Sequence, residues 1–229
     1  MSYFIAASDD GSYYLTSGGI AAIIILIVIL LAAIAFIKKG DGEQNRQNPF
    51  AVKQLVLGAA ALALAFVTSY IKIFSLPWGG SVTLCSMLFV TLIGYWYGPK
   101  IGITAGFAYG LLEFVQDGGS YILDPLQAGL DYIFAFAALG ISGFFSKRKN
   151  GLLTGYIVAI LARGLFHSIG GYIYWMDYMP ESFPSSLKMI YPLAYNYSYI
   201  IAEGLITVII ISIPAVKHAL ARIKSLAIS

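Results

Sequence analysis

The sequence is poor in charge and has a single cysteine. Charged residues make up 11% of the 229 residues, whereas soluble domains carry about 25%. Its apolar segments are separated by polar stretches too short to form a soluble catalytic domain. Cys85 alone cannot form an intrachain disulfide, so we expect it to pack in the core. These shortages exclude a large extramembrane enzyme domain and a disulfide scaffold.

Hydrophobic residues, in contrast, make up 59% of the chain. They form seven apolar segments that are broken by turns containing Gly, Pro, Asn or charged residues. Each segment is long enough to cross a membrane or nearly so. The segments are 18–37, 51–74, 82–98, 101–116, 125–146, 151–175 and 189–214. The sequence predicts an all-α integral membrane protein.

Charges of opposite sign fall at alternate ends of these segments. Basic residues lie at 38–39, 147–149 and Lys217, and acidic residues such as Asp9 and Asp177 lie at the other ends. The positive-inside rule then places the N-terminus outside the cell membrane and the C-terminus in the cytoplasm. This distribution explains the net charge of +3 without a nucleic-acid partner.

The first segment is predicted to be a retained anchor. A signal peptide begins with a basic region, but residues 1–17 contain Asp9 and Asp10 and no Lys or Arg. Residues 40–49 are polar and read as a flexible linker. We therefore divide the chain into an N-terminal transmembrane anchor with linker, 1–49, and a six-helix membrane domain, 50–229.

Three polar residues in separate apolar segments are predicted to lie at nearly the same depth in the membrane. If the flanking segments are helices, Asp131 and His167 each lie about 24 Å from the basic turn at 147–149, in the outer third of a core about 30 Å thick. Asn196 reaches a similar layer when counted from Lys217. Polar groups in hydrocarbon usually face a partner or a cavity. The spacing predicts a binding site.

Four separated motifs carry a resemblance to a known family. They are WGGSVT at 78–83, LDYIFAF at 130–136, HSIGG at 167–171 with Trp175 eight residues after its histidine, and YPLAYN at 191–196. In this order and spacing they resemble the thiamine-specific S components (ThiT family) of energy-coupling factor (ECF) vitamin transporters. The resemblance covers about 50–229 and leaves the first helix outside it.

The resemblance implies a substrate-binding subunit with the six-helix S-component fold. It implies thiamine as ligand, and a transmembrane T component with two cytoplasmic ATPase subunits as partners. It assigns thiamine binding to Trp78, Asp131, Tyr132, His167, Trp175, Tyr191 and Asn196. Thiamine carries a cationic thiazolium and an aminopyrimidine, which suit a carboxylate, aromatic faces and neutral hydrogen-bonding groups. No cofactor or metal is expected.

A second set of ionisable residues is predicted nearer the midplane. Counting from the segment ends places Glu113, Arg163 and Glu203 there. An unpaired charge at that depth is costly, so we expect an ion-paired set centred on Arg163. The predicted ligand contacts carry only negative charge, which argues against phosphorylated forms of the ligand.

Alanines in the first core segment indicate a helix-packing surface. Ala59/Ala63 and Ala61/Ala65 have the four-residue spacing that permits close approach of helices. The resemblance implies that such a pattern docks the T component. Packing within the six-helix core is the alternative.

Three other functions have some support in the sequence. Residues 140–143 match the GxSG of intramembrane serine proteases, but Ser142 lies near the cytoplasmic end, too far from His167 for a dyad. A seven-helix sensor and an S component for another cationic or heteroaromatic vitamin stay open. The chain lacks a GxxxxGK[ST] motif, so ATP hydrolysis would belong to another subunit. A substrate-binding transporter subunit, and not an enzyme, is predicted.

Overall fold

A computed structural model describes residues 3–9, 11–37, 49–77, 79–117, 119 and 121–229. Two antiparallel hairpins pair β1 with β2 and β3 with β4. The strands are β1 Ile5–Ala7, β2 Tyr13–Leu15, β3 Lys72–Ser75 and β4 Ser81–Thr83. The helices are α1 Ser17–Ile37, α2 Pro49–Ser69, α3 Ser86–Tyr97, α4 Pro99–Gln116, α5 Pro125–Ala128, η2 Gly129–Phe134, α6 Ala135–Ala137, η3 Ala138–Phe145, α7 Gly151–Tyr174, η4 Met176–Tyr178, η5 Ser185–Ile190, α8 Tyr191–Ser212 and α9 Pro214–Ile228.

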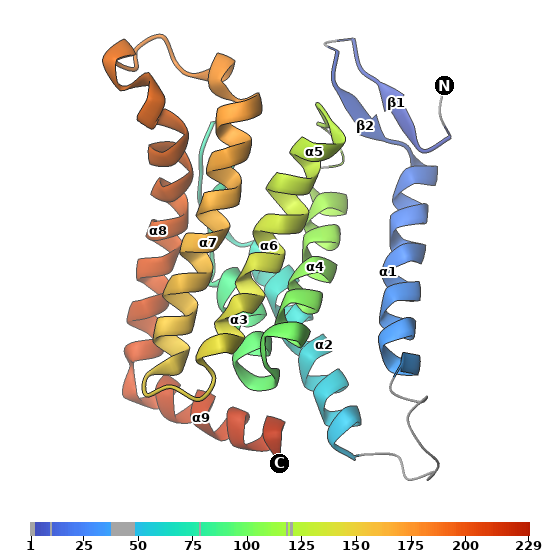
Figure 1. Cartoon of the computed structure of the whole chain (residues 1–229), viewed down its shortest axis with the longest axis vertical. Helices are drawn as coiled ribbons and strands as arrows, with labels where there is room; N and C mark the ends of the chain where they lie inside the picture. Colours follow the sequence, from blue (N-terminus) through green and yellow to red (C-terminus); the bar gives the residue numbers. More distant parts are fainter. Residues whose placement is uncertain (1–2, 10, 38–48, 78, 118, 120) are drawn as a thin grey trace.

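The seven predicted segments correspond to α1, α2, α3, α4, the continuous stretch α5–η3, α7 and α8. Figure 1 shows the last six as a bundle, with α1 standing beside it. Among the described residues, four stretches are long and apolar enough to span a membrane: Val52–Ser69, Pro125–Phe145, Gly151–Tyr174 and Ser185–Ser212. The all-helical membrane fold is confirmed.

The third segment is shorter than predicted. Helix α3 has 12 residues and is about 18 Å long, which is less than the hydrocarbon core. Val82 and Thr83, which the apolar pattern assigns to this segment, belong instead to β4. The β3–β4 hairpin therefore occupies part of the layer that a full helix would fill.

Glycines let α4 and the α6–η3 stretch approach closely. A Cβ added at Gly102 would lie 2.5 Å from Gly94 Cα and 2.7 Å from the Gly140 carbonyl oxygen, and one at Gly106 would lie 2.3 Å from the Phe136 carbonyl oxygen. A Cβ at Gly110 would meet the backbone of Tyr132 in the same way. Gly102, Gly106 and Gly110, spaced four residues apart, thus form a close-packed helix seam.

The N-terminal unit stands at one side of the bundle (Figure 1). Its hairpin folds back onto the start of α1, where the Thr16 hydroxyl donates to the Tyr3 carbonyl at 2.6 Å. Helix α1 then packs against α4. The predicted anchor segment is therefore a helix with its own cap. Residues 40–48 of the predicted linker, 40–49, lie outside the described residues, and Pro49 begins α2.

Helix α9 was not predicted. Pro214 ends α8 because its ring cannot continue the helix, and the chain turns across the bundle end opposite the β1–β2 hairpin (Figure 1). Lys224 joins α9 to that end. Its ammonium donates to the Ser146 carbonyl at 2.9 Å and lies 3.7 Å from the centre of the Tyr95 ring.

Candidate ligand-binding site

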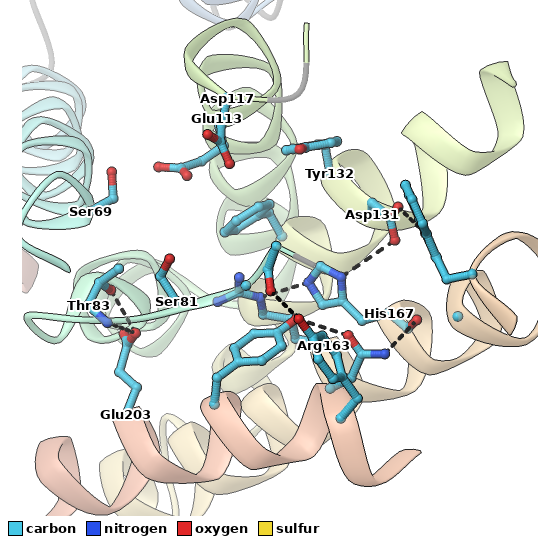
Figure 2. A pocket seen from close by; sticks show the side chains of 18 of the residues that line it. Ser69, Ser81, Thr83, Glu113, Asp117, Asp131, Tyr132, Arg163, His167 and Glu203 are labelled. Atoms are coloured by element: carbon cyan, nitrogen blue, oxygen red, sulfur yellow. Dashed lines mark hydrogen bonds and ion pairs between the residues drawn. The ribbon is translucent and has the colours of Figure 1, made fainter. Parts of the chain in front are cut away.

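One cavity of about 520 Å³ lies among α4, η2, α7, α8 and the β3–β4 hairpin. This size falls within the range of small-molecule sites. Six of the seven predicted ligand residues line it, and Figure 2 shows several of them pointing inward. The six are Asp131, Tyr132, His167, Trp175, Tyr191 and Asn196. Trp78 lies outside the described residues, but Gly79 and Gly80 beside it line the cavity.

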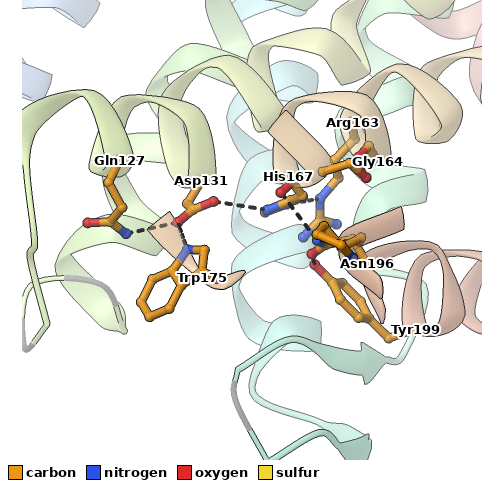
Figure 3. A network of polar contacts seen from close by, with 10 residues as sticks. Gln127, Asp131, Arg163, Gly164, His167, Trp175, Asn196 and Tyr199 are labelled. Carbon is orange, nitrogen blue, oxygen red and sulfur yellow. Dashed lines mark hydrogen bonds and ion pairs between the residues drawn. The ribbon is translucent and has the colours of Figure 1, made fainter. Parts of the chain in front are cut away.

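Asp131 is the centre of a polar network (Figure 3). The Gln127 amide donates to its Oδ2 at 2.8 Å, and the Trp175 indole N–H donates to the same oxygen at 3.3 Å. The other oxygen lies 3.6 Å from His167 Nδ1. Asp131 sits in η2, a π-helical turn within the α5–η3 stretch. Such turns occur often at functional sites because they re-aim side chains.

His167 is held from two sides. Arg163, one turn earlier on α7, donates from Nε to His167 Nε2 at 3.3 Å. A nitrogen that accepts from a guanidinium cannot itself carry the proton, so we assign the proton to Nδ1, which faces Asp131. The imidazole then links Arg163 to the carboxylate as a neutral, oriented ring.

Two adjacent glycines of α7 make room for the polar groups on either side. A Cβ at Gly170 would lie 2.9 Å from Asp131 Oδ1, and one at Gly171 would lie 3.2 Å from Asn196 Nδ2. Asn196 donates to the His167 and Pro192 carbonyls at 3.2 and 2.8 Å, and its Oδ1 accepts from the Tyr199 hydroxyl at 3.1 Å. Any larger residue at 170 or 171 would displace these groups.

Aromatic rings form the rim. Trp175 stacks on Tyr121 with centroids 5.7 Å apart, and the hydroxyls of Tyr121 and Tyr178 are 2.6 Å apart. The Tyr191 and Tyr195 rings lie 5.7 Å apart on the α8 side. All five residues line the cavity. The site therefore combines a carboxylate with several flat apolar faces.

The second predicted layer belongs to the same cavity, but its ion-paired set is wrong. Glu113, Arg163 and Glu203 all line the cavity, and no ion pair joins them within the described part of the chain. Arg163 instead bonds His167 and lies 4.3 Å from the Phe136 ring centre. A cation–π contact and a neutral acceptor replace the expected carboxylate.

The lining is mixed in charge, although acidic groups dominate. Carboxylates of Glu113, Asp117, Asp131 and Glu203 face the guanidinium and ammonium groups of Arg163 and Lys72. The sequence-based expectation of purely negative charge is therefore wrong. Four acidic groups against two basic ones still favour a cationic ligand over an anionic one.

Glu203 joins α8 to the β3–β4 hairpin. Its Oε2 accepts from the backbone N–H and the hydroxyl of Thr83 at 2.9 and 2.6 Å, and its Oε1 accepts from the Met87 N–H at 3.2 Å. The side chain is 2% exposed. A carboxylate satisfied by backbone donors of β4 and the first turn of α3 fixes the base of the hairpin.

Glu203→Gln is expected to destabilise the protein by about 1–3 kcal/mol, because one acceptor oxygen becomes an NH₂ group that faces other donors. Thermal unfolding of the detergent-purified protein measures the effect. Glu181→Gln, at an exposed position, is the control that removes an equal charge. Equal melting temperatures for the two variants would contradict this role.

The four predicted docking alanines separate into two pairs. Ala61 and Ala65 are 4% and 0% exposed, and the Ala65 carbonyl accepts from the Tyr109 hydroxyl at 3.2 Å. They pack inside the core, so their assignment to a docking surface is wrong. Ala59 and Ala63 are exposed on the other side of α2.

Sequence reasoning missed several lining residues. Gln127 lies one turn before Asp131, and Tyr199 lies three residues after Asn196, so helical spacing from predicted positions could have indicated both. The rival Ser142–His167 dyad is not formed. Ser142 is buried and its hydroxyl donates to the Thr91 carbonyl at 2.7 Å, whereas His167 faces the cavity.

Comparisons with known proteins identify the family of this chain. Residues 55–222 match the family described as thiamine transporter protein (Thia_YuaJ). The chain is 33% identical over 181 residues to the thiamine transporter ThiT of Bacillus subtilis, an alignment that covers 73% of this chain and 91% of that protein. It is 23% identical over 188 residues to ThiT of Lacticaseibacillus paracasei, covering 75% and 89%.

Two solved structures share the fold. ThiT from Listeria monocytogenes superposes with a TM-score of 0.56 at 26% identity, covering 72% of this chain and 96% of that one. The S component of a bacterial ECF transporter superposes with a TM-score of 0.51 at 22% identity, covering 76% and 98%. The match over most of the chain and the identity to the Bacillus subtilis protein establish that this protein belongs to the thiamine transporter (ThiT) family.

Proposed function

We propose that this protein is the thiamine-binding subunit of an ECF-type importer. It captures thiamine with high affinity on the outer face of the cell membrane and delivers it together with a transmembrane T component and two cytoplasmic ATPases. The observation that supports thiamine best is the placement of the Asp131 carboxylate beside the Trp175 ring in one cavity.

The chemistry of the cavity suits thiamine part by part. A thiazolium cation over the face of Trp175 or Tyr121 gains about 2 kcal/mol when desolvated. Asp131 compensates the positive charge or accepts from the exocyclic amine of the pyrimidine. The hydroxyl of Tyr191 can donate to a ring nitrogen of the pyrimidine. Asn196, whose amide N–H groups already donate to the His167 and Pro192 carbonyls, can still accept from the exocyclic amine through Oδ1.

The charge distribution supports entry from the outer face. The basic turn at 147–149 and α9 lie at the end of the bundle opposite the β1–β2 hairpin (Figure 1). Basic loops mark the cytoplasmic side. Asp131, His167 and Asn196 lie in the half of their helices far from that turn, so the cavity would open outward, with the N-terminus outside and the C-terminus inside.

The exposed pair Ala59 and Ala63 is the proposed contact for the T component. Both lie on α2 with exposed Val56 and Val67. Small residues on a lipid-facing helix let a partner helix approach to short distance. Ala61 and Ala65 support this surface only from inside the core.

The test is a titration of detergent-purified protein with thiamine, followed by tryptophan fluorescence and calorimetry. We expect saturable binding at sub-micromolar thiamine, which Trp175→Ala weakens. Saturation by a different cationic or heteroaromatic vitamin, with no response to thiamine, would favour an S component of other specificity. No binding of any such vitamin by folded protein would overturn the capture function and favour a sensor.

A further inference from the structure

The N-terminal hairpin is bonded to the loop that follows α4. The Tyr13 N–H donates to the Ile122 carbonyl at 2.8 Å, and the Ile122 N–H donates back to the Tyr13 carbonyl at 2.7 Å. Beside this bridge, Leu15 lies against Gly119, where an added Cβ would be 2.9 Å from the leucine Cδ1. Ile122 itself is 6% exposed. The contact is therefore an isolated antiparallel bridge between β2 and the loop, next to a buried apolar side chain.

The same loop carries part of the cavity rim. Tyr121, next to Ile122, lines the cavity and stacks on Trp175, whose indole N–H donates to Asp131. The Tyr121 hydroxyl is also bonded to that of Tyr178. Any displacement of Ile122 would move Tyr121 off the ring that orients the carboxylate.

The hairpin itself has a fixed support. Besides the Thr16 bond to Tyr3, the Thr16 N–H donates to the Phe4 carbonyl at 3.1 Å, so the hairpin and α1 form one unit. Helix α1 packs on α4, the helix from which the rim loop departs. Both α1 and the hairpin lie outside the residues 55–222 that match the family.

We propose that the β1–β2 hairpin is a brace that holds Tyr121 over the cavity and slows release of the bound ligand. This inference rests on the proposed thiamine-binding function. It gives the N-terminal unit a role at the binding site, with Tyr13 and Leu15 as positioning residues that act through Tyr121.

A matched pair of substitutions isolates the bridge. In β2, both backbone groups of Tyr13 point to Ile122, and those of the next residue point to β1, since hydrogen-bonding directions alternate along a strand. Tyr13→Pro therefore removes the bridging N–H while sparing the β1–β2 ladder, at the first residue of a strand where proline is tolerated. Tyr13→Ala removes the side chain and keeps the bridge.

Two readouts are taken on the full-length protein. Without ligand, hydrogen exchange of the Ile122 amide should be faster in Tyr13→Pro than in Tyr13→Ala or wild type. With radiolabelled thiamine and an excess of unlabelled thiamine, release from Tyr13→Pro should be about two- to tenfold faster, as expected for one lost hydrogen bond. In a Tyr121→Ala background, Tyr13→Pro should cause no further change in release.

A reversible cross-link tests whether strengthening the contact between β2 and the loop slows ligand release. Residues that exchange both backbone bonds have Cα atoms about 5.5 Å apart, which a disulfide can span. The double variant Tyr13→Cys, Ile122→Cys should release thiamine more slowly when oxidised than when reduced. Its reduced form is the internal control for the loss of both native side chains.

The outcomes separate the brace from the proposed function. Unchanged exchange at Ile122 in Tyr13→Pro would overturn the brace whether or not thiamine binds. Two results would overturn the proposed effect of the hairpin on ligand release. One is faster exchange of the Ile122 amide with unchanged thiamine release, and the other is an equal effect of Tyr13→Pro on release in the Tyr121→Ala background. Wild-type protein that fails to bind thiamine would overturn the proposed function, and the exchange measurement would still decide whether the hairpin holds the loop.

Discussion

Asp131→Asn is expected to weaken thiamine binding about ten- to hundredfold while leaving the fold intact. Asn keeps the shape of the side chain but removes the charge that faces a cationic ligand. It also replaces one acceptor oxygen with an NH₂ donor. In the wild-type protein the Asp131 carboxylate accepts from Gln127 and Trp175 and faces His167 Nδ1. At least one of these three donors would lose its partner. Calorimetric titration of purified protein measures the change.

Asp124→Asn is the matched control. It removes the same formal charge from the start of the same stretch, where the Tyr174 hydroxyl and the Leu126 N–H lower the pKa of the Asp124 carboxyl. The amide oxygen of Asn can still accept from the Leu126 N–H and cap α5. Asp124 does not line the cavity. Equal affinities for the two variants would mean that Asp131 is part of the scaffold and does not meet the ligand.

Ala63→Trp is expected to abolish thiamine uptake while changing thiamine binding by no more than about twofold. Ala63 is exposed on α2, so an indole there costs the isolated protein little. It would, however, hold a partner helix away from a surface that needs small residues. The measurement is uptake of radiolabelled thiamine by vesicles that contain the protein with its coupling subunits, compared with binding in detergent.

Ala61→Trp provides the contrast two residues away. Ala61 is 4% exposed inside the bundle, and overpacking a core costs about 1–3 kcal/mol or more. This variant should lose binding and thermal stability together with uptake. If Ala63→Trp supported normal uptake, the proposed T-component surface would have to lie elsewhere on the protein.

The helical segments and the polar layer that lines the cavity could be predicted from the sequence because both depend on position along single helices. Apolar runs mark the spans, and counting residues from the basic turn correctly brought Asp131, His167 and Asn196 together. The resemblance then supplied the ring residues Trp175 and Tyr191. Depth along a helix is proportional to the number of residues counted, so a layer of polar residues can be predicted without knowing the crossing angles of the helices.

Features that depend on the angle around a helix were not predictable in this way. Counting could not tell that Arg163 contacts His167 and Phe136, while no ion pair in the described part of the chain joins it to Glu113 or Glu203. Counting also could not show that Ala59 and Ala63 are exposed while Ala61 and Ala65 are buried, because the helices that pack against α2 determine which of its faces is buried. Helix α9 was missed because Lys217, Arg222 and Lys224 interrupt its apolar positions, so it lacks the continuous apolar run that marks a membrane-spanning segment.

The π-helical turn at Gly129–Phe134 restricts how this segment can change in length. Gln127 before the turn and Asp131 within it line the cavity, and Phe136 and Gly140 after it pack against the glycine seam of α4. Losing one residue would rotate one half against the other by about 100°, so ligand contact and helix packing could not both survive. Homologous proteins should therefore differ by substitutions in this stretch, and single-residue insertions and deletions should be selected against.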